Sequence, residues 1–445
     1  MEMIKSGTQK RISVSLFALL FLAALLGLSI LLESCSDKCE VTSEYTYFAP
    51  VYTPLTEIRS SVKLGSPEPI TEVGKIYFKD GYLFVNQPGK GIHIIDNRDA
   101  SHPQVLSFLT IPGNYDLAAK GNTLYADSYI DLVALDIADI THIREIERLE
   151  NVFSTYNTLG FYVDADKGLV TDWVEQKEVK VYESDCEASI MPWGGFYFED
   201  GIAVLNGQAF NKSAALTPGT GSGPGVGGSM ARFTINANYL YALDAGFIQS
   251  VDITSETQPV AKTRTSISWD METIFPYGTN LFIGSRSGMH IIDVSKPETP
   301  VKISTYAHVT VCDPVVVEGD LAYVTLRTGN SCPRGVNELA VVDITDLKTP
   351  KLIKNYPMHN PHGLGIDEST LFICDGDEGL KVFDAKDVNQ IDKNLLKHYK
   401  AIHAYDVIPF NNTLMMIGED GLFQFDYTDP KEIKFLSKIA LENAN

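Results

Sequence analysis

Short apolar runs that end in an acidic residue recur along this chain. Seven of them end in aspartate, at Asp96, Asp136, Asp252, Asp293, Asp343, Asp384 and Asp426. A degenerate eighth copy, Val179–Glu183, ends in glutamate. Asp252 and Asp293 are 41 residues apart, as are Asp343 and Asp384, and the longer gaps are interpreted as insertions. A period of this length indicates one repeat architecture rather than a series of unrelated domains.

Each repeat has the same internal order of apolar runs and turns. In residues 269–306 the apolar runs are 273–276, 281–284, 289–294 and 301–305. Turn-forming residues separate them, and the last connection, 296–300, contains two prolines, so it is neither a helix nor a central strand. No unit has the 3.6-residue apolar spacing of a helical repeat. Four short strands per repeat are typical of a β-propeller blade, with strands A to D running outward.

We therefore predict an all-β fold, a β-propeller of four-stranded antiparallel blades that occupies residues 69–441 as one domain. Eight units can be counted, so eight blades are expected. Seven blades are the alternative, because the third unit is weak and the Gly-rich insertion 206–229 interrupts the repeat. Within that insertion, Gly223, Gly225 and Gly228 have the spacing G-x-G-x-x-G. A dinucleotide site needs a strand before this motif and a helix after it. Neither is predicted here, so the segment is interpreted as a flexible insertion.

The repeated aspartates and glycines are interpreted as structural residues. Each aspartate ends strand C, where its side chain can cap the C–D turn as in an Asx turn. Gly91, Gly288, Gly379 and Gly421 stand between strands B and C, where a positive φ is expected. A ring of calcium carboxylates is the alternative. One aspartate per blade does not supply the roughly six to eight oxygens that calcium takes.

These runs, followed by a turn as in Asp293-Val-Ser-Lys-Pro297 and Asp343-Ile-Thr-Asp346, resemble the LVIVD repeat of bacterial lipoproteins and exported proteins. The resemblance covers nearly all of the chain after its leader. It implies propeller architecture, and it implies no catalytic residues, because the family has no agreed activity.

The first 34 residues are expected to be a lipoprotein signal peptide. Lys5, Lys10 and Arg11 form a positive region, and residues 14–32 form an apolar run. Leu32-Glu33-Ser34-Cys35 resembles a lipobox, which makes Cys35 the lipidated residue and residues 35–68 a tether and linker. Ser36 resembles the residue that follows the lipidated cysteine in lipoproteins sorted to the outer membrane. An uncleaved transmembrane anchor is the alternative, since the apolar run is long enough to span a bilayer.

Composition and charge limit the classes of partner that the protein can bind. The 445 residues have a formal net charge of −21, which argues against nucleic acid, because phosphate binding needs a basic footprint. Five cysteines remain after Cys35, an odd number for an exported protein. Cys312 and Cys332 are the candidate disulfide, because both map to one face of one unit. No C-x-x-C motif occurs. Cys186 and Cys374 are expected to be free.

Candidate chemistry gathers on the end of the propeller that carries the D–A and B–C connections, which we call the loop face. Function usually lies on loops held by a rigid scaffold. Polar and aromatic residues predicted there also include Tyr115, Asp116, Tyr129, Asp131, Asp377, Tyr405, Glu419 and Asp420. The candidate ligand-binding residues are Trp269, Asp270, Glu272, Arg286, His308, Asp313, Arg327, His359, His362, Asp375, His403 and Asp406. Such a mouth could bind a sugar, a peptide or a metal ion.

Two local sequence patterns on this face resemble metal-binding sites. His359-Asn-Pro-His362 is an H-x-x-H segment, and the neighbouring loop contains Cys374, Asp375 and Asp377. Histidine, cysteine and aspartate can all coordinate a divalent metal ion. However, Pro361 makes that segment extended, and a turn with locally bonded histidines is the favoured interpretation. Asp375-Gly-Asp377 resembles the start of a calcium-binding loop, but the glutamate that such a loop needs further along is absent. The segment is therefore interpreted as a hairpin turn. No metal site and no cofactor is therefore predicted.

The sequence favours a non-enzymatic, lipid-anchored envelope protein that binds a ligand or partner through the loop face. The alternatives are a glycan-acting propeller enzyme with carboxylates in its funnel and an assembly or scaffold protein of the envelope. Closely placed carboxylates with raised pKa would favour the enzyme, an aromatic and arginine-rich mouth the binding protein, and an apolar patch on the rim the scaffold.

Overall fold

The computed structural model of the chain describes residues 38–154, 162–164, 166–185, 197–198, 225–308, 314–328 and 336–442. The chain divides into a smaller unit, Met1–Val51 with Asp172–Gly207, and a larger unit, Tyr52–Thr171 with Gln208–Asn445. Strands dominate both. The described helices are α2 (Leu55–Ser60) and a single 3-10 turn, η1 (Ile391–Lys393).

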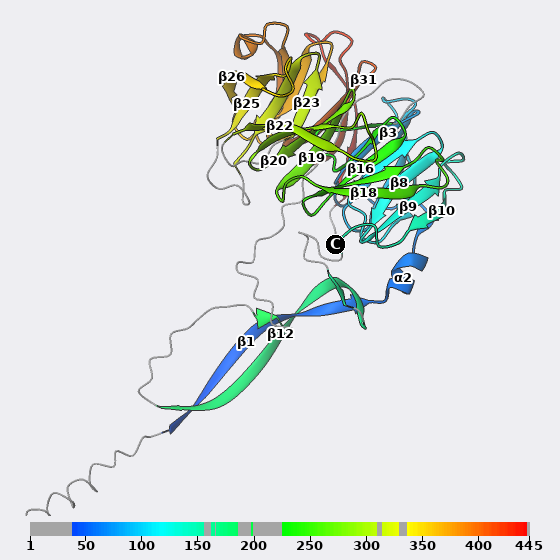
Figure 1. Cartoon of the computed structure of the whole chain (residues 1–445), viewed down its shortest axis with the longest axis vertical. Coiled ribbons are helices and arrows are strands. Elements are labelled where there is room, and N and C mark those ends of the chain that lie inside the picture. Colours follow the sequence, from blue (N-terminus) through cyan, green and yellow to red (C-terminus); the bar gives the residue numbers. More distant parts are fainter. Residues whose placement is uncertain are drawn as a thin grey trace, which may run out of the picture. The chain divides into compact units, whose positions relative to one another are not determined.

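The smaller unit contains most of two long strands, β1 (Lys38–Thr53) and β12 (Gly168–Asp185), which are neighbours in one sheet and lie side by side in Figure 1. β13 (Tyr197–Phe198) pairs parallel with β1, and β11 (Val163–Asp164) pairs antiparallel with β12. The degenerate repeat copy falls on β12. Its Val179 and Val181 are each 60% exposed, unlike the buried apolar residues of a blade.

The larger unit contains seven antiparallel sheets of repeated design (Figure 1). The first three are β3–β6 (Ile76–Lys79, Tyr82–Gln87, Gly91–Asp96, Gln104–Thr110), β7–β10 (Leu117–Lys120, Thr123–Ser128, Asp131–Asp136, Arg144–Leu149) and β15–β18 (Phe233–Asn236, Tyr239–Asp244, Phe247–Asp252, Val260–Ser266). The next two are β19–β22 (Met271–Tyr277, Asn280–Ser285, Gly288–Asp293, Val301–Ala307) and β23–β26 (Val315–Glu318, Leu321–Leu326, Glu338–Asp343, Lys351–Pro357). The last two are β27–β30 (Leu364–Asp367, Thr370–Cys374, Leu380–Asp384, Leu395–Tyr399) and β31–β34 (Ala404–Phe410, Thr413–Gly418, Gly421–Asp426, Lys434–Ala440).

The seven sheets form a closed ring. The first strand of each sheet contacts the first strand of the next, from β3 through β7, β15, β19, β23 and β27 to β31. The ring closes where Ile76 and Leu83 of the first sheet share an apolar cluster with Ile408 and Met415 of the last. First strands therefore line the centre, as strand A of a propeller does. The all-β propeller fold is confirmed.

The sheet count resolves the number of blades. The described residues form eight sheets, but the sheet with β1 and β12 runs through the smaller unit and takes no part in the ring. The propeller in the larger unit therefore has seven blades rather than the eight expected, and seven is the alternative that the sequence left open. Two short strands extend the first blade: β2 (Lys63–Gly65) outside β6, and β14 (Val226–Gly227) inside β3.

The Asx-turn interpretation of the repeated aspartates is confirmed in all seven blades. In each, one carboxylate oxygen accepts the backbone N–H two residues later, at 2.7 to 3.1 Å. The B–C glycines also behave as expected. Gly379 and Gly421 have φ of 77° and 132°, and a Cβ atom on either would overlap a backbone carbonyl of strand D. Every blade therefore fixes its C–D turn through its own aspartate, and the blades with these glycines fix the B–C turn as well.

Replacing Asp343 with alanine should lower the free energy of unfolding by about 1 kcal/mol, because the Thr345 N–H loses its acceptor at 2.9 Å. Asp343→Asn, which keeps an acceptor oxygen, should cost less. Urea unfolding of the three proteins checks this. Equal midpoints for the alanine and asparagine variants would show that the carboxylate does not hold the turn.

Candidate functional site

The loop face collects the buried acidic groups of the propeller. Six aspartates are buried among the described residues, namely Asp116, Asp131, Asp244, Asp270, Asp375 and Asp406. Every one lies at or beside the start of a strand A, in a B–C connection, or at the strand end next to one. The repeated strand-C aspartates at the opposite end are only half-buried. Because burying a charge is costly unless it is paired, this concentration marks the loop face as the specialised end of the ring.

The centre of the ring is filled by residues 225–231, which we call the plug. β14 of the plug pairs with β3, and Gly225 donates its N–H to Ala119 O on β7 at 2.9 Å. Ile274 on β19 donates to Ala231 O at 2.8 Å. The plug side chains Val226, Ser229 and Met230 are no more than 7% exposed. The end of the predicted flexible insertion thus has a fixed place, whereas residues 206–224 lie outside the described residues.

The plug is also held by buried polar side chains. Ser229 Oγ donates to Asp406 Oδ1 at 3.0 Å and accepts the Leu364 N–H at 3.0 Å. Lys75 Nζ donates to Met230 O at 2.9 Å and lies 3.8 Å from Asp116 Oδ2. Burial lowers the pKa of Lys75 to about 8 and raises the pKa of Asp406 to about 8. The plug therefore contacts the inner strands of five blades: β3, β7, β19, β27 and β31.

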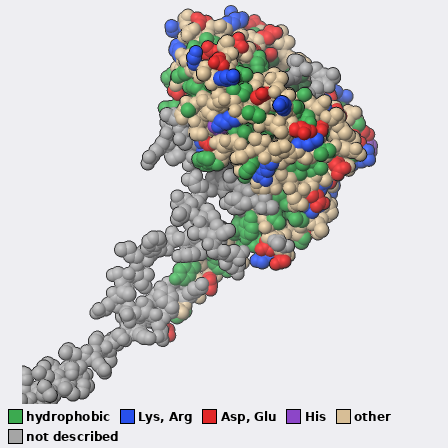
Figure 2. All heavy atoms as spheres, viewed as in Figure 1, with side chains coloured by type: hydrophobic (Ala, Val, Ile, Leu, Met, Phe, Trp, Pro, Cys, Tyr) green, Lys and Arg blue, Asp and Glu red, His purple; other side chains and the backbone are tan. Residues whose placement is uncertain are grey.

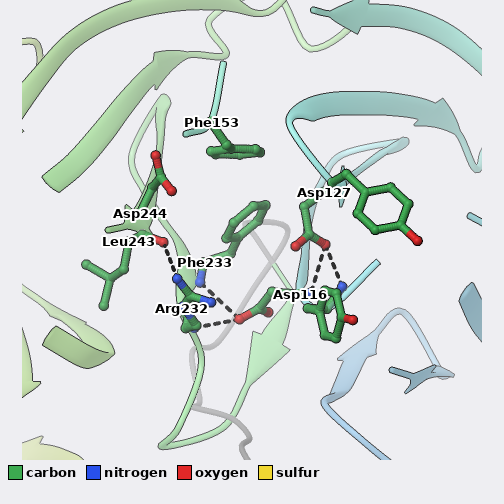
Figure 3. Close-up of a pocket in the computed structure, with 9 residues that line it drawn as sticks. Asp116, Asp127, Phe153, Arg232, Phe233, Leu243 and Asp244 are labelled. Atoms are coloured by element: carbon green, nitrogen blue, oxygen red, sulfur yellow. Dashed lines mark hydrogen bonds between the residues drawn. The ribbon is translucent and has the colours of Figure 1, made fainter. Parts of the chain in front are cut away.

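A recess beside the plug lies between the blades β7–β10 and β15–β18 (Figure 3). It holds about 30 Å³ and is lined by Tyr115, Asp116, Asp127, Tyr129, Phe153, Arg232, Phe233, Leu243 and Asp244. The Phe153 and Phe233 ring centroids are 5.6 Å apart. Tyr129 has a φ of 55°, a rare backbone conformation for an aromatic residue. The recess combines aromatic surface with carboxylates and a guanidinium.

Backbone N–H groups hold both central carboxylates of this recess. Asp127 Oδ1 accepts from Tyr115 N at 2.7 Å and Asp116 N at 2.9 Å (Figure 3). Asp116 Oδ2 accepts from Arg232 N at 2.5 Å, and Arg232 Nη2 donates to Leu243 O at 3.0 Å. Burial raises the pKa of Asp127 to about 7 and the pKa of Asp116 above its ordinary value. The two carboxylates fix the loops around the recess.

Five predicted residues converge on the other side of the mouth. Arg286 Nε donates to Glu272 Oε1 at 2.9 Å, and Glu272 also attracts Arg327. Arg327 in turn acts electrostatically on His362, whose ring centroid is 6.1 Å from that of His403. These residues come from four successive blades, β19–β22 to β31–β34. The structure brings this subset of the predicted mouth together.

Asp375 and the H-x-x-H segment have a structural arrangement. Asp375 is fully buried and accepts the backbone N–H groups of His359 and Asn360 at 2.8 to 3.1 Å. Lys381 Nζ also donates to its carboxylate. His359 is exposed and His362 is 5% exposed, so the two imidazoles lie in different surroundings. Across the described residues, no group of three or more His, Cys, Asp or Glu side chains is arranged to hold a metal ion.

The other predicted residues are less closely grouped, although Asp270 O accepts the Arg286 N–H at 3.2 Å. Trp269 is 79% exposed beside Asp270, which is 3% exposed. Half-buried His308 has its ring centroid 6.3 Å from that of Tyr306. Cys374 is buried and free, as expected. The remaining predictions, Asp313, the Cys312–Cys332 disulfide, Cys186 and lipidation at Cys35, lie outside the described residues. No helix within the described ranges is long and apolar enough to cross a membrane.

Sequence reasoning missed Lys75, Asp127, Ser229 and Arg232. Lys75 and Arg232 each stand directly before a strand A, like Asp116. A charged residue immediately before a buried apolar run is therefore the signal that was available for them. Ser229 carried no such signal, because it lies in a segment whose composition is typical of a linker.

The comparisons with known proteins concern family and architecture. The LVIVD repeat family matches residues 311–357, the span of the blade β23–β26. No curated protein is detectably similar in sequence. Among solved structures, the computationally designed Ika8 protein has a TM-score of 0.48 and 10% identity over 85% of this chain and 92% of its own. BamB from Moraxella catarrhalis has a TM-score of 0.45 and 8% identity over 87% of this chain and 97% of its own.

A third similar structure is PorZ of Porphyromonas gingivalis, described as a bacterial surface component of the type-IX secretion system. Its TM-score is 0.45 and its identity 11%, over 86% of this chain and 40% of PorZ. With TM-scores of 0.45 to 0.48 and identities of 8 to 11%, these similarities carry no information about ligands or partners.

Proposed function

Because this chain is a β-propeller that carries the LVIVD repeat, we propose that it is a binding protein of the cell envelope that holds a ligand or partner on its loop face. The observation that carries this proposal is the gathering of all six buried aspartates of the described chain at that end. A rigid ring with costly buried charge at one end is the expected design of a binding scaffold.

Local groups on the loop face are expected to select the ligand. Figure 2 shows Lys and Arg side chains interspersed with Asp and Glu on the side of the larger unit in view. Mixed charge of this kind gives little long-range steering. The plug supports the same proposal, since it fills the centre of the ring and leaves the surrounding mouth as the binding surface.

Lipid anchoring at Cys35 is the second part of the proposal. Its support is the positive region, the apolar run and the Leu32–Cys35 sequence. Metabolic labelling with an alkyne palmitate tests it: the wild type should be labelled and found with the outer membrane, and Cys35→Ser should lose both. Cys39→Ser, four residues further on, is the matched control and should keep both. Labelling that survives Cys35→Ser would contradict lipidation at this residue.

A glycan-acting enzyme is the second candidate, and the recess at Asp116 and Asp127 favours it. Two carboxylates with raised pKa in one recess, the buried Asp116 and the half-buried Asp127, resemble an acid–base pair. Their oxygens, however, already accept backbone N–H groups, which favours a structural role. The two functions separate in one assay. A binding protein should give a thermal shift with glycans or cell-wall fragments and no product, whereas an enzyme should release product in a reaction that Asp127→Asn abolishes.

A scaffold that acts through the rim is the third candidate. Exposed apolar side chains stand near the start of strand D in five blades: Val260, Val301, Leu352, Leu395 and Phe435. They belong to separate blades, and lysines such as Lys262 and Lys354 interrupt the outer strands. Charged residues on outer strands are the usual protection against edge-to-edge association. The loop face is therefore the favoured surface.

A further inference from the structure

Two buried hydrogen-bond donors at the mouth have no acceptor. His362 is 5% exposed, and its Nε2 lies 3.2 Å from Asn360 Nδ2. An amide nitrogen can only donate, so Nε2 accepts and the ring proton resides on Nδ1. His362 Nδ1 is buried without a hydrogen-bond partner. Burial first, then the charges of Arg327 and His403, lower the pKa of His362 to about 3, which keeps the ring neutral.

Arg327 supplies the second donor. It follows β24, and its Nε is likewise buried without a hydrogen-bond partner. Thr325, two residues before it, donates Oγ1 to the backbone carbonyl of His362 at 2.6 Å. Alternate residues of a strand point to the same side. Arg327 and His362 therefore lie close together between the blades β23–β26 and β27–β30, and we call this place the Arg327–His362 spot.

The arginine side of this spot carries a positive balance, whereas Asp377 and Glu419 lie 2.5 and 3.8 Å from His403 Nδ1 on the other side. Arg286 and Arg327 share the single carboxylate of Glu272, which leaves one excess positive charge in a chain of net charge −21. The rings of His403 and Tyr405 lie 6.1 and 5.7 Å from that of His362 and form an aromatic wall. Arginine and a neutral Nδ1–H offer donors only, which suits a group that has acceptors only.

We propose that Arg327 and His362 bind an oxyanion, a carboxylate or phosphate group of the ligand held on the loop face. The inference rests on the proposed function and specifies the chemistry of its ligand. The Nε–H of Arg327 and the Nδ1–H of His362 donate to the anion, and the excess charge of the Arg286–Glu272–Arg327 group attracts it. Buried donors without acceptors are rare in folded proteins, and a ligand oxygen satisfies both.

Calorimetric titration of the full chain in detergent tests the proposal, with inorganic phosphate and sodium acetate in separate arms. Saturable binding of either anion is expected. Arg327→Gln should weaken it about tenfold or more, because a charge-assisted bond is lost. Arg98→Gln is the matched control. Arg98 pairs with Asp96 in a C–D turn at the opposite end of the blades, so binding should be unchanged.

A second measurement needs no variant. In ¹⁵N spectra of the wild type, the Nδ1–H signal of His362 should shift with the same anion dependence as the calorimetric signal. Binding of phosphate alone would identify a phosphate ligand, binding of acetate alone would identify a carboxylate, and binding of both would show a site that accepts either oxyanion. Absence of saturable binding of both anions overturns the proposal, as does an equal loss in the Arg98→Gln protein. If neither anion binds but a partner still contacts the loop face, the proposed function stands. Only the proposal that its ligand is an anion is then wrong.

Discussion

Replacing Gly363 with alanine is expected to lower the free energy of unfolding by about 3 kcal/mol or more. Gly363 lies just before β27, and a Cβ atom there would overlap the carboxylate of Asp406. The carboxylate can move only by giving up its 3.0 Å bond to Ser229 in the plug. The substitution therefore combines a steric clash with loss of a buried hydrogen bond. Chemical unfolding followed by far-UV circular dichroism measures the effect.

Two further variants isolate the cause. Gly319→Ala is the matched control, since no atom lies within 4 Å of a Cβ atom at Gly319, whose φ of 61° should cost only about 1 kcal/mol. Gly363→Ala combined with Asp406→Ala should recover part of the loss, because the two nearest clashing atoms are then absent. A Gly363→Ala protein as stable as Gly319→Ala would show that the contact with Asp406 is not as tight as described.

Asp406→Asn is expected to become more stable relative to the wild type as the pH rises from about 4 to about 8. Burial raises the pKa of Asp406 from 3.8 to about 8. Between those values the unfolded chain releases a proton that the folded chain keeps, so the wild type loses stability as the pH rises. Asparagine has no proton to release, and its amide oxygen still accepts from Ser229. At about 1.4 kcal/mol per pKa unit, the relative gain amounts to several kcal/mol.

Denaturant unfolding of both proteins at several pH values measures this difference. Asp96→Asn provides a comparison of opposite sign. Its bond to Arg98 lowers the pKa of Asp96 to about 2, so the wild type gains stability relative to that variant as the pH rises from 2 to 4. A stability difference between Asp406→Asn and the wild type that does not change with pH would contradict a neutral, buried Asp406.

The fold was predictable wherever local chemistry repeats. The order of strands in residues 269–306 matches β19 to β22, with ends that differ by two residues or fewer. The strand-C aspartates were predictable because an Asx turn depends on one side chain and the backbone two residues later. Such features need no knowledge of distant residues. The smaller number of blades was harder to predict, because Val179–Glu183 has the apolar alternation of a strand without a core to cover.

The candidate site was predictable only in part, because it depends on contacts far apart in sequence. Propeller topology places D–A and B–C connections at one end, and that sufficed to group Glu272, Arg286, Arg327, His362 and His403. It could not show that Asp375 and Asp406 turn inward to hold backbone and plug. The plug itself was missed because its order comes from edge pairing with β3 and bonds to Lys75 and Asp406, which glycine-rich composition does not encode.

Photo-crosslinking in living cells can show directly whether the loop face contacts the partner. A photoreactive amino acid would replace Trp269 on the loop face, which is 79% exposed, or Phe435 on the rim, which is 57% exposed. Binding through the loop face should give a discrete adduct from position 269 and none above background from position 435. Adducts from position 435 alone would contradict it and would assign binding to the rim.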